Sequence, residues 1–401
     1  MTFATLYRPF VNALIVAVIW VLDTINALFD PFKSSVDTPT TSDLSGMEAL
    51  FTADLEARFM QPSGEFFYQI PRPADAGDTA LFQGLCTAMK ILKGDKVDTQ
   101  LAFINTLFVN GALIRGYRDD GTPNDTTSND SGTGMLFFFY TALRFGDADL
   151  RRKTSALLRT WINSIMAHNG ALVDLNGNPT TYGQLDNGLM TDPLRITLYL
   201  AILAVGMIYE TDGTTIHDEY ARVYNLYHSI LAYPKVKFLW WDTSYDTHRA
   251  AIHLHVLYAL TNEPVFKKGL QRIWRITKKE NNAWVYTLCR DALEYWDEDS
   301  MVWQVLGTFD FQRRQLGNIE SLNKVPSVFW PPKWVPSLLG NPVERSLIAL
   351  PISHRGSQEF FWQRNMFSKD EWVGGTMAGC YHSGLDILIC GWLASRLGIS
   401  Q

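Results

Sequence analysis

Four stretches of the sequence share one pattern: an aspartate, a small or polar residue, and then an apolar run long enough for a helix. The aspartates are Asp78, Asp130, Asp192 and Asp246, which lie 52 to 62 residues apart. Each apolar run ends in a short polar turn, and a more charged amphipathic stretch follows it. This spacing, with one apolar and one amphipathic helix in each unit, predicts an architecture of repeated helix pairs.

About six apolar helices alternate with about six amphipathic ones along the chain. The stretch 194–208 is apolar on nearly every side, as a helix surrounded by other helices must be. Apolar inner helices ringed by amphipathic outer ones describe an all-α fold, an (α/α)6 toroid. An open solenoid is the rival architecture, but solenoid repeats are usually shorter, at roughly 34 to 47 residues. We therefore predict a closed toroid over residues 44–401.

Outside the four repeats, the pattern predicts a first helix over 43–60 and a last one over 383–397, which ends before Gly398. The stretch 97–114 is expected to be one amphipathic helix that follows the first apolar one. Residues 317–375 are rich in proline and tryptophan, and we expect irregular structure there with room for a short strand or two.

An apolar helix is predicted at the start of the chain, over residues 1–33, and a polar linker, 34–43, separates it from the toroid. Its run from Phe10 to Leu22 is short for a membrane span, and no small-residue cleavage site of a signal peptide follows it. A membrane, other copies of the chain, a larger particle or the chain's own toroid could cover such a helix. Its polar residues fall near one stripe: Thr5, Arg8, Asn12, Asp23, Asn26 and Asp30.

Charge and cysteine content exclude several classes of protein. The net charge of −6 gives no basic surface for a nucleic acid. The four cysteines show neither CxxC pairing nor zinc-ligand spacing, so a disulfide framework or a zinc site is not expected. No P-loop, GxGxxG, GxSxG or HExxH motif is present.

The repeated aspartates are the candidate catalytic residues. In a toroid of helix pairs, the long loops lead into the first turns of the inner helices, where Asp78, Asp130, Asp192 and Asp246 all lie. Several carboxylates around one cavity mouth would supply the acid and the base that cleavage of a glycosidic bond needs. Each aspartate could instead simply cap its own helix, because a side-chain oxygen there accepts hydrogen bonds from free backbone N–H groups.

Further polar and aromatic residues near the predicted mouth are candidates for binding a sugar. The loop 115–134 is the most polar in the body, and its oxygen atoms could bind sugar hydroxyls or Ca²⁺, although its spacing does not match an EF-hand. His248 is expected to be a core or cavity histidine, because no third metal ligand accompanies it and His255. The predicted substrate-binding residues are Asp119, Asp120, Arg195, Trp240, Trp241, His248, Trp362, Arg364, Tyr381 and His382.

The body resembles the six-hairpin glycosidase superfamily. The features that carry the resemblance are the helix openings GDTALFQGLCTAM and NDSGTGMLFFFY, the WQR segment at 362–364 and the closing SGLDILICGWLASRLG. The resemblance covers roughly residues 44–398 as architecture, but no catalytic pair of the superfamily maps onto this sequence. It implies an α/α toroid and, for active members, a sugar enzyme with acids at the toroid mouth.

Three functions follow as hypotheses. The first is a glycoside hydrolase acting on a polysaccharide, with Asp130 paired with Asp78, Asp192 or Asp246. The second is a non-catalytic, glycan-binding or structural subunit, held in a homo-oligomer or a larger assembly such as a virion or surface filament by residues 1–33. The third is a polysaccharide lyase with Tyr381, His382 or His248 as base. All three place the protein outside the cytoplasm, at a surface or in an extracellular assembly.

Overall fold

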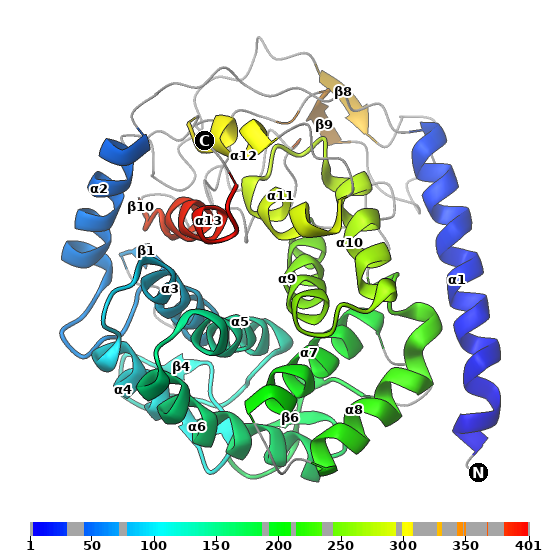
Figure 1. The fold of residues 1–401 in the computed structure, drawn as a ribbon, viewed down its shortest axis with the longest axis horizontal. Helices are drawn as coiled ribbons and strands as arrows, with labels where there is room; N and C mark the ends of the chain where they lie inside the picture. The colour runs from blue at the N-terminus through cyan, green and yellow to red at the C-terminus, as the bar shows by residue number, and fades with distance from the viewer. Residues whose placement is uncertain are drawn as a thin grey trace.

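The computed structural model describes the chain in segments: residues 3–29, 44–71, 78–186, 192–209, 214–234, 244–293, 299–307, 327–330, 343–347, 349, 367 and 381–399. The predicted linker 34–43 lies outside them. Figure 1 shows the helices of the described part arranged as a ring, with α1 (Phe3–Phe29) beside its outer edge.

Six helices of the described residues form the inner ring. Each inner helix packs against the next in chain order, and the last packs against the first, which closes the ring. An open solenoid would leave its first and last units apart, so the predicted (α/α)6 toroid is confirmed. The inner helices are α3 (Thr79–Lys93), α5 (Asn129–Phe145), α7 (Pro193–Tyr209), α9 (Ser244–Thr261), α11 (Ala283–Cys289) and α13 (Leu385–Arg396).

The outer helices alternate with the inner ones along the chain and cover their outer sides (Figure 1). As predicted from its composition, α7 is buried on all sides, from Ile196 to Gly206. The outer helices in the described part are α2 (Leu44–Asp54), α4 (Asp98–Thr106), α6 (Ala148–Ala167), α8 (Thr214–Tyr227), α10 (Pro264–Thr277) and α12 (Asp299–Leu306).

Short helical turns extend three of these helices. The π-helical turn η1 (Leu55–Phe59) follows α2, so the first predicted helix keeps its full length. The 3₁₀ turns η3 (His228–Ile230) and η4 (Arg290–Ala292) follow α8 and α11.

The predicted helix over 97–114 is wrong in its second half. The helix α4 ends at Thr106, and a hairpin of β2 (Phe108–Val109) and β3 (Ala112–Leu113) follows it. Asn110 and Gly111 form the turn with positive φ angles of 51° and 84°. An Asn-Gly pair adopts such angles readily, so a two-residue hairpin turn is favoured here over a continued helix.

The remaining strands in the described residues form short antiparallel pairs. They are β1 (Gln69–Ile70) with β10 (Tyr381–His382), β4 (Gly116–Tyr117) with β5 (Pro123–Asn124), β6 (Ala171–Val173) with β7 (Pro179–Gln184), and β8 (Ser327–Trp330) with β9 (Val343–Ser346). The β8–β9 pair confirms the strands expected within residues 317–375.

Two glycines allow the inner helices α3 and α5 to pack with their backbones in contact. A Cβ atom on Gly84 of α3 would collide with the backbone of Gly134, and one on Gly134 of α5 would collide with the backbone of Leu81. The absence of side chains lets the two helix backbones touch. The first turns of α3 and α5 therefore come close together, and both carry a predicted catalytic aspartate.

The N-terminal helix α1 lies outside the toroid and packs on the turn after α8 and on α8 itself. Arg8, Asn12 and Asp23 of its predicted polar stripe all make hydrogen bonds to the toroid. Of the coverings considered for this helix, the chain's own toroid therefore covers its polar side. Its apolar side remains exposed.

Candidate functional site

Three inner helices bring aspartates to the same end of the toroid. Asp78 immediately precedes α3, Asp130 is the second residue of α5, and Asp246 is the third residue of α9. Because inner helices all run in the same direction, their first turns lie at one face of the ring. These are positions at the starts of inner helices, where the sequence pattern predicted the repeated aspartates.

Arg249, one turn into α9, joins two of the aspartates. Its Nη1 donates to Oδ1 of Asp130 and, at 2.7 Å, to Oδ1 of Asn129. Its Nη2 donates to Oδ1 of Asp246. The planar fork of a guanidinium suits such a role, because it offers several N–H groups in one fixed plane. Arg249 therefore fixes Asp130 and Asp246 relative to each other.

The cation is buried, whereas its two carboxylates are partly open. The side chain of Arg249 is 8% exposed, against 20% for Asp130 and 23% for Asp246. Both carboxylates are therefore partly open to solvent, whereas most of the guanidinium is not.

Tyr245 packs against Arg249 in the same site. Its ring lies 4.8 Å from the carbon of the Arg249 guanidinium, and the charge of Asp130 acts on its phenol. Burial raises the pKa of Tyr245 well above its ordinary value, and the charges of Asp130 and Asp78 raise it further against the opposing charge of Arg249. The phenol therefore keeps its proton at neutral pH and can act as a donor.

Asp78 lies near the same site and pairs with a second arginine. Nη2 of Arg115 donates to Oδ1 of Asp78 at 2.6 Å, and the charge of Asp78 acts on Tyr245. The cluster thus contains three carboxylates, two guanidinium groups, one amide and one phenol. We call this set the carboxylate cluster: Asp78, Arg115, Asn129, Asp130, Tyr245, Asp246 and Arg249.

The simpler interpretation of the aspartates, helix capping, holds for Asp192. Its Oδ1 accepts a hydrogen bond of 3.0 Å from the backbone N–H of Leu194, at the start of α7. The side chain of Asp78 makes no capping bond although it occupies the cap position, and Ser128 rather than Asp130 is the cap residue of α5. Asp192 is therefore the weakest catalytic candidate of the four.

Beneath the cluster, a buried histidine ties three inner helices together. Nε2 of His253 lies 2.8 Å from Oγ1 of Thr133 on α5, and its Nδ1 lies 3.2 Å from Oγ1 of Thr197 on α7. Burial and the nearby Arg249 charge lower the pKa of His253 well below its ordinary value. The imidazole is therefore neutral, and it supports the site without adding a second cation under Arg249.

His248 is buried and bound to groups at the start of α11. Its Nε2 lies 3.3 Å from Oε2 of Glu280 and 3.1 Å from Nδ2 of Asn282. Asn282 in turn caps α11 through the N–H of Val285. The expectation of a core or cavity histidine is met, and these contacts give His248 a positioning role between α9 and α11.

The other predicted binding residues in the described part lie outside the cluster. Asp119 and Asp120 are exposed at the tip of the β4–β5 hairpin, where Oδ1 of Asp120 accepts from the backbone and hydroxyl of Thr122. Arg195 donates to the carbonyl of Gln184 at 3.3 Å. Tyr381 packs against Arg58, whose guanidinium carbon lies 5.2 Å from the ring centre.

Several predictions fall outside the described residues. They concern Trp240, Trp241, Trp362 and Arg364, and the side chain of His382. Among the side chains that the structure describes, no group of three or more His, Cys, Asp or Glu residues could hold a metal ion. Ca²⁺ binding by the 117–130 loop stays a prediction.

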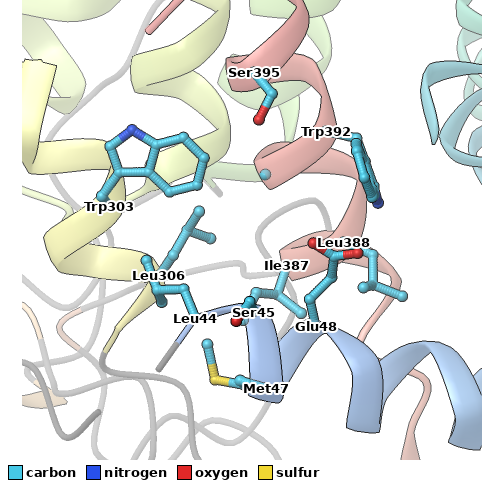
Figure 2. Close-up of a pocket in the computed structure, with 11 residues that line it drawn as sticks. Leu44, Ser45, Met47, Glu48, Trp303, Leu306, Ile387, Leu388, Trp392 and Ser395 are labelled. Carbon is cyan, nitrogen blue, oxygen red and sulfur yellow. The ribbon is translucent and has the colours of Figure 1, made fainter. Parts of the chain in front are cut away.

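An apolar groove lies elsewhere on the ring, between α2, α12 and α13. Figure 2 shows Trp303 and Trp392 on opposite sides of it, with Leu306 and Ile387 between them. Glu48 is its one carboxyl group, and burial raises the pKa of that group while Lys93 opposes the rise. A two-carboxylate mechanism cannot be built from one acid. The carboxylate cluster is therefore the candidate site.

The sequence did not single out Arg249, Tyr245, Asn129 or Arg115 as site residues. A usable signal existed for Arg249, because an arginine three residues after Asp246 on one helix lies on the same face. No such signal links Arg249 to Asp130 or Arg115 to Asp78, since those pairs lie 119 and 37 residues apart.

No protein-family model matches this chain, and no curated protein matches it. Similar solved structures include a glycoside hydrolase family 76 mannosidase from Bacteroides thetaiotaomicron, at 11% identity and a TM-score of 0.49, covering 89% of this chain and 98% of that one. Another is a family 76 glycoside hydrolase from a bovine Bacteroides thetaiotaomicron strain, at 10% identity and a TM-score of 0.49, covering 89% and 78%. The toroid itself is established by the closed ring of this chain's own helices.

Proposed function

We propose that this chain is a carbohydrate-active protein that hydrolyses glycosidic bonds of a polysaccharide at the carboxylate cluster. The observation that carries the proposal is the meeting of Asp130 and Asp246, from two different inner helices, on one guanidinium, with Asp78 near enough for its charge to act on Tyr245. Capping alone would need no contact between helices. Hydrolysis of a glycoside, in contrast, needs one group that gives a proton and one carboxylate that acts as base or nucleophile.

Asp130 is the central group in this proposal. It pairs with Arg249, its charge acts on Tyr245, and its side chain is 20% exposed. A carboxylate held by a guanidinium is suited to act as base or nucleophile, with Arg249 orienting it. The second carboxyl group of the pair would be Asp78 or Asp246, which would have to carry a proton to act as the acid.

The test is a screen of polysaccharides and aryl glycosides with the purified protein and two matched variants. Asp130→Asn should lower turnover by about 10²- to 10⁴-fold, the usual contribution of a general acid or base. Asp192→Asn should behave as the unmodified chain, because an asparagine caps a helix as well as an aspartate does. Hydrolysis that survives Asp130→Asn, in a folded protein, would rule out this assignment.

A second candidate function is glycan binding without catalysis. The observation in its favour is that guanidinium groups engage all three carboxylates: Arg249 holds Asp130 and Asp246, and Arg115 holds Asp78. Such a surface can bind hydroxyl groups even if no acid is poised to give a proton. Binding measured by calorimetry on the same polysaccharides, with no reducing ends released, would favour this function over hydrolysis.

Polysaccharide lyase activity stays the third hypothesis. It needs a base, and two of its three proposed bases are engaged in the described structure: His248 with Glu280 and Asn282, and Tyr381 with Arg58. Release of unsaturated products in the same screen would identify it.

A further inference from the structure

The face of α1 that packs on the toroid carries buried polar residues together with the apolar Ile15, Val16 and Ile19. Its polar residues face the toroid. Arg8 donates to the Tyr227 hydroxyl at 3.1 Å, and its guanidinium carbon lies 4.5 Å from that ring. Nδ2 of Asn12 donates to the carbonyl oxygen of Leu226 at 3.1 Å.

An ion pair fixes the second half of the helix. Asp23 accepts from Nε and Nη2 of Arg272 on α10, at 2.9 and 2.8 Å, in the parallel geometry that arginine and a carboxylate prefer. Arg8 and Asn12 lie on the same stripe as Asp23, so specific polar contacts dock the helix along its length.

The opposite face of α1 is apolar and exposed. Phe10 is 72% exposed, Trp20 67% and Leu28 74%. A helix of 27 residues is about 40 Å long at a rise of 1.5 Å per residue, so these side chains form a long apolar strip. Such a continuous exposed strip marks an interaction surface. The exposed large apolar residues of α1 are Tyr7, Phe10, Leu14, Val18, Trp20, Val21 and Leu28.

The charged residues near the apolar strip of α1 indicate which partner covers it. Residues 264–279, which contain α10, hold six lysines or arginines and no aspartate or glutamate, although the chain as a whole has a net charge of −6. Lys268 and Arg275 are exposed, and they lie four residues before and three after Arg272, hence on the side of α10 that meets α1. Exposed basic side chains thus flank the docked side of α1.

We propose that α1 and this side of α10 form an attachment surface for an anionic lipid bilayer. The helix α1 lies flat in the interface, with its apolar side chains at the headgroup–acyl boundary, while Lys268 and Arg275 contact the anionic headgroups. Apolar side chains next to a cluster of lysines and arginines are the pattern of interfacial helices.

The docked geometry favours this arrangement over a membrane-spanning helix and over a contact with a second copy of the chain. The stretch Tyr7–Ile25 is long and apolar enough to cross a bilayer, but a crossing helix would have to release Asp23 from Arg272 and carry Arg8 and Asn12 into hydrocarbon. A second copy of the chain would add further basic side chains and no complementary acidic ones. A flat helix on lipid keeps every polar contact of α1.

The experiment is flotation of the full chain with vesicles of phosphatidylcholine alone and of phosphatidylcholine with phosphatidylserine. We expect binding to the anionic vesicles that weakens at high salt. The double variant Phe10→Ser/Trp20→Ser should lower the partition coefficient at least tenfold, because it removes two strongly exposed aromatic side chains that would anchor in the bilayer. Lys268→Glu with Arg275→Glu should lower it about tenfold at low salt and less at high salt.

The matched control is Leu175→Ser with Tyr182→Ser, which removes two exposed apolar residues of the β6–β7 region and should leave vesicle binding unchanged. Circular dichroism and thermal unfolding establish that each variant is folded. Equal flotation of the Phe10/Trp20 variant and the control would overturn the proposal. The strip would instead be the contact with a second copy if the unmodified chain binds no vesicles but is a dimer in light scattering, and the Phe10/Trp20 variant is a monomer.

Discussion

At the scale of single residues, the site depends on one buried cation. Arg249 holds Asp130 and Asp246, from α5 and α9, while Tyr245 packs against it. Removing one partner of a buried ion pair leaves the other charges uncompensated, and this costs more than the pair itself contributes. Arg249 should therefore matter to stability as well as to the orientation of the carboxylates.

We predict that Arg249→Met lowers the free energy of unfolding by about 3 to 5 kcal/mol, because two partly buried carboxylates lose their common partner. Urea unfolding monitored by circular dichroism measures the change. Adding Asp130→Asn to Arg249→Met should recover part of the loss, since one unpaired charge is then gone. Arg152→Met is the control, because Arg152 is 74% exposed and pairs only at the surface, where ion pairs contribute about 1 kcal/mol or less. Equal losses for the two arginines would contradict this view.

A second residue-scale prediction concerns His255 on α9. Its Nε2 lies 3.3 Å from the Tyr140 hydroxyl and its Nδ1 lies 3.0 Å from the Leu288 carbonyl. Burial lowers the pKa of His255 to about 4, against 6.5 for an ordinary histidine. Between these pH values the unfolded chain binds a proton that the folded chain does not bind. The stability that neutral His255 contributes is therefore present above pH 6.5 and is lost as the pH falls toward 4.

The expected result is a pH-dependent difference between the unmodified chain and His255→Gln. That difference in unfolding free energy should shrink by roughly 2 to 3 kcal/mol between pH 7 and pH 4.5, because only the unmodified chain loses the histidine contribution. Urea unfolding at both pH values measures it. A difference that stays constant with pH would show that His255 titrates normally in the folded protein.

At the scale of elements, the sequence predicted the inner helices well, because a helix that is buried on all sides must be apolar on all sides. The stretch 194–208 was assigned on that basis and became α7. The error at 107–114 arose from giving the apolar periodicity more weight than the Asn110–Gly111 turn signal. The carboxylate cluster was only partly predictable, since the first turns of inner helices share one face but the arginines that join them come from distant positions.

Close helix contact leads to the third prediction. Gly134→Ala should destabilise the chain by about 1 to 3 kcal/mol, because its new methyl group would meet the backbone of Leu81 on α3 and force the two helices apart. Gly391→Ala on α13 is the matched control. The nearest atoms to its new methyl group would be 4.0 Å away, so the change should stabilise the helix by about 0.5 to 1 kcal/mol. Thermal unfolding compares the two, and the same sign for both would contradict the close-contact argument.

At the scale of the whole molecule, the ring closes between its two ends. Helix α13 packs on α3, and strand β10 pairs with β1, so residues near the C-terminus complete the toroid that α2 begins. Helix α1 lies apart from that closure, because within the described residues it packs on the outer side of the ring, against α8, α10 and the turn after α8 (Figure 1). Folding of the ring and attachment of α1 are therefore separable.

The last prediction follows from that separation. Deleting residues 1–33 should leave a folded toroid, because ring closure between α3 and α13 is intact, and it should leave hydrolysis or glycan binding at the carboxylate cluster unchanged. The melting temperature should fall modestly, since Tyr227 and Arg272 lose their partners Arg8 and Asp23. Binding to anionic vesicles should be lost, because Lys268 and Arg275 alone provide charge without an apolar anchor. Calorimetry, the substrate screen and flotation on the same preparation check the three parts. A truncated chain that is folded and still binds vesicles as tightly as the full chain would show that attachment lies elsewhere on the ring.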